Sequence, residues 1–358
     1  MQVALLYGGR SPEHEVSINS AYTVHKALQE AGHSVLLIAI TLEGRWFLQR
    51  ELRQKIDTTQ PLLLQPGLGI YWGKEKLEIA AAFATTHGYQ GEDGNLQGTC
   101  LLCNIPLCGC DTASSAIGMH KAIASALFSA NGIPTVPSCT LDSYQLKTLG
   151  KDLFNSVIAS LGKDLFIKPE NSGSSVGVQA LPQATYPMFL EAVETAAQYS
   201  ERVLVQKYME ATTEVECALL RTEDGTLHVA GPGRVIDPAK EAAGFLSYAH
   251  KYGQVDTAHI QVPAGLNADI EEKIRTYART AFLAIKADGY ARVDFFLQGE
   301  SIFLNEINTS PGMTTLSHYP VLMASIGYDL PHVLDALISH ALHRASAEKG
   351  RHYTPPRT

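Results

Sequence analysis

The sequence lacks the features that mark membrane, secreted and nucleic-acid-binding proteins. No apolar run approaches the length of a membrane span, and no basic segment precedes the short apolar run of the opening MQVALLYGG. We therefore expect a first β-strand there rather than a secretory signal. The net charge of −8 leaves no broad basic surface. These absences predict a cytoplasmic protein with no membrane partner and no nucleic-acid partner.

Aromatic and charged residues are also sparse, at 8% and 18% of the chain, beside 45% hydrophobic residues. This composition is typical of an ordinary α/β globular protein rather than a disordered or fibrous one. A length of 358 residues exceeds one typical domain. We therefore expect two or three units, each with its own core.

Cysteine is infrequent, but four of the six cysteines are clustered at Cys100, Cys103, Cys108 and Cys110. Such a cluster could bind zinc. The segment TCLLCNIPLCGC is otherwise apolar, which favours small buried thiols instead. We expect buried thiols, and the role of the cluster stays open.

The spacing of apolar residues predicts the first unit. Residues 3–7 and 34–40 are predicted strands on either side of a helix at 17–31, a βαβ opening typical of a doubly wound parallel sheet. Residues 113–131 are predicted to form one continuous helix, stopped by a glycine and a proline just beyond. We expect an N-terminal α/β substrate domain over residues 1–112.

Two further units follow, a central one over residues 113–207 and a C-terminal one over 208–358. The expected elements of the central unit are a strand at 164–168, the loop ENSGSSVG, a helix at 186–198 and a strand at 203–206. Those of the C-terminal unit are a strand at 214–220, a polar lid loop at about 232–263, a helix at 268–286 and a fraying tail after 343.

The segment ARVDFFLQGESIFLNEINTSPGM carries a hairpin signal, because two alternating apolar runs flank a short polar stretch. Glu306 and Asn308 are two residues apart, so they project from the same face of a strand. A three-residue loop over 299–301 would place Asp294 opposite Glu306, whereas a two-residue loop would pair it with Asn305. We predict the three-residue loop.

Asp294, Glu306 and Asn308 would then form a set of oxygen ligands that suits Mg²⁺. A solvated strand face would explain the same spacing equally well. Arg292 and the loop SPGM favour the metal site, because a guanidinium and backbone amides beside a metal can stabilise phosphoryl or acyl transfer.

Lys168 ends a predicted strand, and the small residues of the loop after it could let backbone amides close over phosphates. Such glycine–serine loops are commonly only turns. The loop matches neither a Walker A sequence nor the GxGxxG fingerprint. A P-loop enzyme or an NAD enzyme is therefore disfavoured.

Eight motifs in order along the chain carry a resemblance to a known family. They are GGRSPEHEVS, HGYQGEDGNLQG, GMHK, IKPENSGSSVGV, EVEC, AHKY, ARVDFF and LNEINTSPGM. Over nearly its whole length the chain resembles the D-alanine–D-alanine ligases of the ATP-grasp superfamily. The resemblance implies an ATP-grasp fold, an α/β domain followed by two α+β units that clasp ATP. It also implies ADP-forming synthesis of D-alanyl-D-alanine through a D-alanyl phosphate, for peptidoglycan.

The resemblance further implies an ATP site between the second and third units. Its residues would be Lys121 and Lys168 at the phosphates, Ser175 in the covering loop, Gln206, Lys207, Tyr208 and Met209 at the adenine, Glu214 at the ribose and Lys251 in the lid. Gln206 departs from the family pattern, in which a glutamate is common. Asp294, Glu306 and Asn308 match the family's ligands for two Mg²⁺ ions, for which Mn²⁺ could substitute.

Amino-acid subsites are implied in the same way. Glu13 would hold the ammonium of the first D-alanine in a chain with Ser174 and Tyr252, and Arg292 with the Gly312 amide would stabilise the oxyanion. His87 and Ser317 would bind the second substrate. Without the resemblance, spacing favours an exposed helix cap for Glu13, a structural polar residue for His87 and a surface loop around Tyr252.

His318 leaves the second substrate open. Alanine-specific members of the family usually carry an apolar residue there, and relatives that make altered termini often carry arginine. We expect a D-alanine–D-alanine ligase, with a D-alanyl-D-lactate or D-alanyl-D-serine ligase as the alternative and an inactive nucleotide-binding module as a distant one. The resemblance also implies a homodimer.

Overall fold

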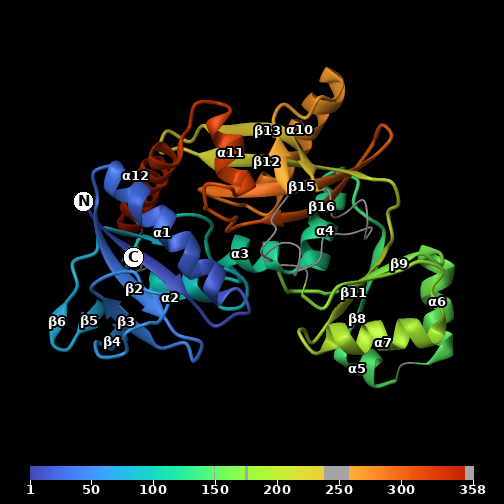
Figure 1. The fold of residues 1–358 in the computed structure, drawn as a ribbon, viewed down its shortest axis with the longest axis horizontal. Helices are drawn as coiled ribbons and strands as arrows, with labels where there is room; N and C mark the ends of the chain where they lie inside the picture. The colour runs from blue at the N-terminus through green and yellow to red at the C-terminus, as the bar shows by residue number, and fades with distance from the viewer. Residues whose placement is uncertain (149, 174–175, 238–257, 351–358) are drawn as a thin grey trace, which may run out of the picture.

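The structure is a computed structural model that describes residues 1–148, 150–173, 176–237 and 258–350. Three units surround a common centre in Figure 1: the N-terminal unit in blue, the central unit in green and the C-terminal sheet in yellow and orange. Each unit is built on its own sheet, with strand orders β3-β2-β1-β7, β10-β9-β11-β8 and β14-β13-β12-β15-β16, and β4-β5-β6 form a small fourth sheet.

The N-terminal unit has a parallel sheet with helices on both faces. Its elements are β1 (Gln2–Gly8), α1 (His14–Glu30), β2 (Ser34–Ile40), β3 (Trp46–Gln49), β4 (Leu62–Gln65), β5 (Gly69–Trp72), β6 (Glu75–Lys76), β7 (Ala81–Ala84) and α2 (Asn95–Leu102). β1 pairs in parallel with β2 and β7, which confirms the predicted βαβ opening, and β3 adds an antiparallel edge.

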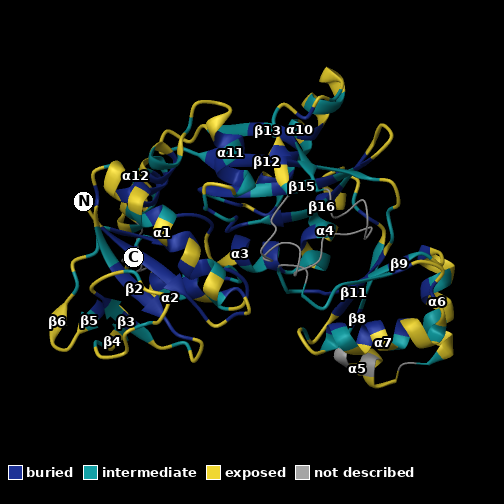
Figure 2. Cartoon of the chain, in the orientation of Figure 1, coloured by how far each residue is buried: buried dark blue, intermediate teal, exposed yellow. Residues whose placement is uncertain are grey.

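Side chains of β1 alternate between two cores, as period-two geometry requires. Val3, Leu5 and Tyr7 pack with α1 in the larger core, whereas Ala4 and Leu6 belong to a second core with residues of α2. The central strands are accordingly buried in Figure 2, while the helices expose one face. The clustered cysteines are buried, as expected, and burial raises the pKa of Cys100 and Cys110 to about 12.

The central unit is an antiparallel sheet covered by helices. Its elements are α3 (Thr112–Met119), α4 (Lys121–Ala130), β8 (Ser138–Leu141), α5 (Ser143–Lys147), α6 (Lys151–Leu161), β9 (Leu165–Pro169), β10 (Gln179–Leu181), α7 (Tyr186–Ala197) and β11 (Val203–Lys207). Phe189, Ala192, Val193 and Ala196 of α7 are fully buried against the sheet. Their spacing of three and four residues is the helical period that the sequence shows.

The continuous helix predicted over 113–131 is wrong, because the chain breaks at His120 between α3 and α4. Glu170, just after β9, supplies the physical reason. Its buried carboxylate accepts a hydrogen bond from the amide of Ala122 (3.3 Å) and contacts His120 Nδ1 (2.7 Å). An acidic group at a helix start satisfies open backbone amides. This contact makes Lys121 the first residue of α4.

The C-terminal unit is an antiparallel sheet whose last two strands are the predicted hairpin. Its elements are β12 (Thr213–Arg221), β13 (Leu227–Ile236), β14 (His259–Gln261), α10 (Ala268–Ala284), β15 (Tyr290–Gln298), β16 (Ser301–Asn308), α11 (His318–Ala324) and α12 (Leu330–Lys349). None of the helices among the described residues is long and apolar enough to cross a membrane.

Two predicted boundaries in this unit are wrong. The polar stretch at 232–263 begins and ends in strands, because Val235 of β13 pairs with Ile260 of β14; residues 238–257 lie outside the described residues. The tail expected to fray after residue 343 remains helical to Lys349. α12 packs against α1 and β7 of the N-terminal unit, and this distant packing stabilises its polar end.

The hairpin turn also differs from the prediction. Gln298 pairs with Ser301, so the loop has two residues rather than three. Asp294 nevertheless lies opposite Glu306, as predicted, because a β-bulge between Asp294 and Phe295 places Asn305 as an extra residue in β16. The bulge compensates for the shorter turn.

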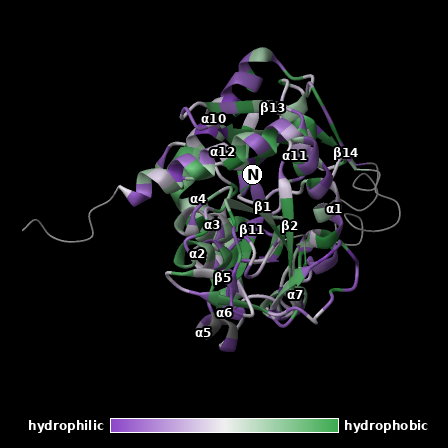
Figure 3. Cartoon of the chain, turned by 90° about the vertical axis from the view of Figure 1, so that its left-hand side faces the viewer, coloured by the Kyte–Doolittle hydropathy of each residue, from purple (hydrophilic) through white to green (hydrophobic). Residues whose placement is uncertain are grey.

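The largest core crosses the boundary between the first and last units. It joins β1, α1 and β7 to residues of β12, α11 and α12, such as Leu220, Tyr319 and Leu337. In Figure 3, β2 is largely apolar, whereas α10 and α12 combine apolar and polar surfaces. The N-terminal unit therefore packs directly on the sheet that carries the hairpin.

Candidate active site

A cavity of about 550 Å³ is lined by residues of all three units. Every predicted site residue that the structure describes lines it, namely Glu13, His87, Lys121, Lys168, Gln206, Lys207, Tyr208, Met209, Glu214, Arg292, Asp294, Glu306, Asn308, Gly312, Ser317 and His318. Ser174, Ser175, Lys251 and Tyr252 lie outside the described residues. Residues far apart in sequence thus share one site, and their individual roles stay predictions.

Three carboxylates form a row across neighbouring strands in one wall of the cavity. The backbone register places Glu216 of β12 beside Asp294 of β15, and Asp294 beside Glu306 of β16. Arg292 donates hydrogen bonds to both oxygens of Asp294 (2.8 and 2.7 Å) and lies 3.1 Å from Glu216 Oε2. Asn308 Nδ2 donates to Asp294 Oδ2 (3.0 Å).

The charges in this row are not balanced by the protein alone. Burial, followed by the neighbouring carboxylates of Glu216 and Glu306, raises the pKa of Asp294 although Arg292 opposes the shift. Burial would lower the pKa of Arg292, but the Asp294 and Glu216 carboxylates raise it, so the guanidinium is charged. Such crowded oxygen donors fit a hard divalent cation.

No group of three or more His, Cys, Asp or Glu side chains among the described residues could hold a metal ion by itself. A cation at the row would therefore need the amide oxygen of Asn308 and oxygens from water or phosphate. Mg²⁺ commonly takes one or two carboxylates and completes its shell with such oxygens. The residues present fit Mg²⁺ on this ground.

Glu216 was not predicted from the sequence, although it is buried in the cavity wall. Its Oε2 lies 2.9 Å from His318 Nδ1, so one carboxylate orients both His318 and Arg292. A signal was available, because Glu214 and Glu216 are two apart on a strand and therefore share a face.

Glu13 is buried and makes no side-chain cap bond to α1, so the exposed-cap alternative is wrong. A second carboxylate that the sequence reasoning missed, Glu92, lies beside it. Glu13 Oε2 and Glu92 Oε1 both lie within 3.6 Å of the position that a Cβ at Gly173 would occupy. The amide of Gly88 donates to Glu92 Oε1 (3.1 Å).

Burial and the nearby charge of Glu13 raise the pKa of Glu92 to about 8. Two carboxylates at one point disfavour double ionisation, so a bound ammonium would relieve the repulsion. Glu92 stands in the motif HGYQGEDGNLQG, in which only His87 was predicted to bind a substrate.

His87 is held by the C-terminal unit. Its Nδ1 lies 3.1 Å from the carbonyl oxygen of Ser310, and Ser310 Oγ donates to the carbonyl of Thr86 (3.3 Å). Its Nε2 is buried with no hydrogen-bond partner among the described residues. A buried polar atom of this kind in a cavity wall is available to a ligand.

Two lysine side chains lie next to the carboxylate row. Lys121 Nζ donates to the carbonyl of Ser172 (2.7 Å) and lies 3.8 Å from Glu306 Oε2. Lys168 Nζ donates to Asn305 Oδ1 (3.5 Å), the residue inserted by the bulge. Beyond them, the rings of Phe166 and Tyr208 stack at 6.3 Å and provide apolar surface beside the buried Gln206.

The loop after β16 is tightly packed. A Cβ on Gly312 would lie 2.8 Å from Ser317 Oγ, so any side chain at this position would displace the Ser317 hydroxyl. Ser317 Oγ in turn accepts a hydrogen bond from the amide of Thr314 (3.0 Å). The loop therefore holds the Gly312 backbone and the Ser317 hydroxyl close together at the cavity wall.

Two sheets around a cavity lined by lysines and by a carboxylate row define the ATP-grasp class of ligases. The family model described as D-ala D-ala ligase N-terminus matches residues 2–110, and that described as D-ala D-ala ligase C-terminus matches residues 127–339. The chain belongs to the D-alanine–D-alanine ligase family.

Individual relatives agree over nearly the full length. D-alanine–D-alanine ligase A of Brucella suis is 36% identical over 97% of this chain and 99% of its own. The structure is similar to the D-alanine–D-alanine ligase of Coxiella burnetii (TM-score 0.83, 29% identity, 98% and 96% of the two chains). It is also similar to the VanG D-Ala:D-Ser ligase of Enterococcus faecalis (TM-score 0.81, 31% identity, 95% and 99%).

Proposed function

We propose that the protein is an ATP-dependent D-alanine–D-alanine ligase that joins two D-alanines through a D-alanyl phosphate. The observation that carries the proposal is the carboxylate row beside Arg292, in one cavity with the Glu13 carboxylate and with the lysines Lys121 and Lys168. A protein that only bound a nucleotide would have no use for an amino-acid subsite at this point.

ATP would lie between the central and C-terminal units. Lys121 and Lys168 carry the positive charge that phosphates require, and the apolar surface of Tyr208 with Met209 suits an adenine ring. The Glu214 carboxylate would accept hydrogen bonds from the ribose hydroxyls. Lys207, Ser175 and Lys251 complete the proposed nucleotide site, the last two from outside the described residues.

Two Mg²⁺ ions, or Mn²⁺ in their place, would be held by Asp294, Glu306 and Asn308. The carboxylate row would repel phosphate oxygens unless cations lay between them, which supports this assignment. When bound, the metal ions neutralise charge on the phosphates during phosphoryl transfer.

The chain's own residues would orient the two substrates. Glu13, with Glu92 beside it, would hold the ammonium of the first D-alanine so that its carboxylate faces the terminal phosphate. The amine of the second D-alanine would then attack the acyl phosphate, and phosphate would leave. Arg292 and the Gly312 amide would stabilise the oxyanion that forms in between.

The acceptor would lie between His87 and Ser317, with the unpartnered Nε2 of His87 as one contact. Ser174 and Tyr252 would complete the hydrogen-bonded chain of side chains that starts at Glu13. The loop that contains Tyr252 would exclude water from the acyl phosphate. By family role, the product would enter peptidoglycan precursors in the cytoplasm, and the enzyme would be a homodimer.

D-Serine is a second candidate acceptor, because His318 presents a polar ring held by Glu216 where an apolar side chain would favour alanine. The D-Ala:D-Ser ligase among the similar structures supports testing it. D-Lactate is the remaining alternative. D-Alanine is favoured as the acceptor because the curated relatives matched over nearly full length are D-alanine–D-alanine ligases.

The test is an ADP-release assay with ATP, magnesium and D-alanine, repeated with D-serine or D-lactate added and with the metal chelated. We expect D-alanine alone to sustain turnover, mass spectrometry to detect D-alanyl-D-alanine, and chelation to stop the reaction. ADP release only with D-serine or D-lactate would show that the acceptor is not D-alanine. ATP binding without ADP release under any pair of substrates would overturn the proposal that the protein is an enzyme.

A further inference from the structure

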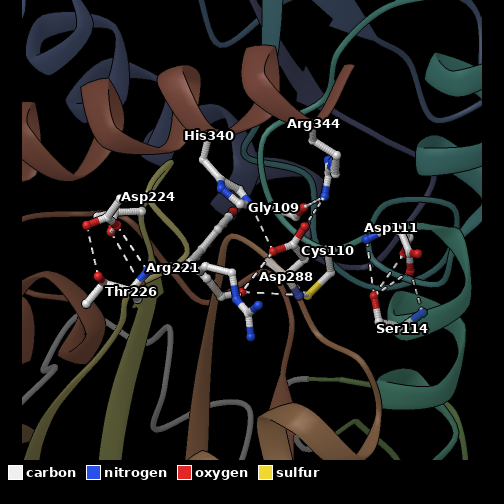
Figure 4. Close-up of polar contacts among 12 residues, drawn as sticks. Gly109, Cys110, Asp111, Ser114, Arg221, Asp224, Thr226, Asp288, His340 and Arg344 are labelled. Carbon is white, nitrogen blue, oxygen red and sulfur yellow. Dashed lines mark hydrogen bonds and ion pairs between the residues drawn. The ribbon is translucent and has the colours of Figure 1, made fainter. Parts of the chain in front are cut away.

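A partly buried polar cluster lies outside the cavity, where the first and last units meet. It is centred on Asp288, in the connection between α10 and β15, and we call it the Asp288 cluster. Asp288 accepts a hydrogen bond from His340 Nε2 (2.8 Å) and one from Arg344 Nη1 (3.0 Å), and Arg221 Nε lies 3.6 Å away. Figure 4 shows these side chains converging from α12 and β12.

The carboxylate at the centre is charged. Burial alone would raise the pKa of Asp288, but the hydrogen bond from His340 and the charge of Arg344 outweigh it and lower the pKa to about 2. A partly buried charge held by several partners is costly to disturb, because removing one partner weakens the arrangement of the others. We therefore expect the Asp288 cluster to fix the position of the segments that it joins.

The same arginine also binds the edge of the N-terminal sheet. Arg344 donates to the carbonyls of Leu107 (2.7 Å) and Gly109 (2.9 Å). This segment continues the sheet, because the amide of Cys108 donates to Ala82 of β7 (2.8 Å). Cys110 adds a hydrogen bond from its thiol to the Asp288 carbonyl (3.3 Å).

Backbones of the two units touch at this point. A Cβ on Gly289 would lie 2.7 Å from Gly109 Cα, so neither side has room for a side chain there. The next residue, Tyr290, stacks on Phe83 of β7 with ring centroids 5.9 Å apart. Hydrogen bonds, an aromatic pair and backbone contact therefore join β7 to the start of β15.

Both of these strands lead directly into the cavity. β7 continues to His87, and β15 continues from Tyr290 to Arg292 and Asp294. The second link between the units, from Thr86 and His87 to Ser310, lies at the cavity itself. The Asp288 cluster thus holds one end of the two strands whose other ends carry substrate-binding side chains.

We propose that Arg344 and His340 are positioning residues for the amino-acid substrates: through Asp288 and residues 107–110 they set the spacing between the N-terminal subsite residues and β15. This rests on the proposed function, in which D-alanine binds between the N-terminal and C-terminal units. ATP, in contrast, would lie between the central and C-terminal units, away from the cluster. A defect in the cluster should therefore weaken amino-acid binding selectively.

The test replaces Arg344 by methionine, which keeps the apolar stem and removes all three hydrogen bonds, and by lysine, which restores a charge. His343→Gln is the matched control, since His343 is an exposed neighbour on the same helix. For each protein we would measure KM for D-alanine, KM for ATP, kcat and the melting temperature. Calorimetric titrations with D-alanine and with ADP give binding without turnover.

We expect Arg344→Met to raise KM and Kd for D-alanine about tenfold while the ATP and ADP values stay within about twofold, as a small misplacement of binding groups implies. Arg344→Lys should recover part of the lost affinity for D-alanine. The control His343→Gln should bind D-alanine as the wild type does. Equal changes for D-alanine and nucleotide, or a lower melting temperature with unchanged binding, would overturn the proposal.

If Arg344→Met does not fold, Arg344→Lys and His340→Gln carry the same test, because each leaves other bonds of the cluster intact. Failure of the proposed function is recognised separately. It would appear as wild-type protein that makes no D-alanyl-D-alanine, whereas the cluster is judged from the ratio of variant to wild type in the two titrations.

Discussion

Carboxylates decide the chemistry of the cavity at the scale of single residues. Glu306 ends the row across three strands, and its neighbour Asp294 accepts hydrogen bonds from Arg292 and Asn308. Glu92 lies near Glu13, where side chains in place of Gly88 and Gly173 would crowd the Glu13 carboxylate. The environment of each carboxylate, rather than its residue type, distinguishes the proposed metal site from the proposed ammonium site.

Replacing Glu306 by glutamine removes one charge from the row and keeps its shape. Turnover should fall at least about a hundredfold, because a neutral amide is a poor ligand for a divalent cation. ADP release measures the effect, and circular dichroism checks the fold. Glu300→Gln, in the exposed turn of the same hairpin, is the control. Near-normal turnover of Glu306→Gln would rule out the metal site.

Replacing Glu92 by glutamine should stabilise the ligand-free protein at alkaline pH. Its folded pKa of about 8 lies above the ordinary 4.5, so its contribution to stability is present below pH 4.5 and is lost as the pH rises towards 8. A neutral amide avoids this loss, by about 1 kcal/mol or more. Melting temperatures at pH 5 and 8.5 test it, with exposed Glu78→Gln as control. Equal shifts at both pH values would contradict the assignment.

Irregularities place the functional groups at the scale of elements. The break between α3 and α4 puts Lys121 at a helix start, and the bulge in β16 puts Asn305 within reach of Lys168. The sequence indicated a helix and a hairpin correctly, but not these interruptions. Glu170 and the shorter turn cause them, and both act through contacts between strands and helices that local periodicity does not contain.

Removing the cap tests the helix break. Glu170→Ala should destabilise the protein by about 1 to 2 kcal/mol, because the amide of Ala122 and the ring of His120 lose their buried partner. It should also raise KM for ATP, since Lys121 would no longer be held. Thermal unfolding and ATP kinetics measure both effects, with exposed Glu191→Ala as control. Unchanged ATP kinetics would show that the Glu170 cap does not affect the nucleotide site.

One shared core joins the first and last units at the scale of the whole molecule. α12 contributes to that core and also carries two partners of Asp288, His340 and Arg344. The residues from 343 onwards are polar in sequence and were expected to fray, yet Arg344 bonds three acceptors. The reason is tertiary, because all three acceptors belong to other segments of the chain.

Asp288→Asn should make the protein less stable near neutral pH and less sensitive to acid. The folded pKa of about 2 lies below the ordinary 3.8, so its stabilisation is present above pH 3.8 and is lost as the pH falls towards 2. The loss at pH 7 should be about 2 kcal/mol. Denaturant unfolding at pH 7 and pH 3 measures it, with exposed Asp152→Asn as control. An equal loss at both pH values would contradict the assignment.

The βαβ opening, the main elements of the two later units, the family and the chemical types in the site follow from the sequence by itself. These depend on alternation, helical spacing and short motifs, which are local in the chain. The tertiary structure alone decided the register around the bulge, the break at His120, the roles open to Glu92 and Glu216, and the Asp288 cluster. Register, burial and charge coupling arise only when distant segments pack together, so no local pattern contains them.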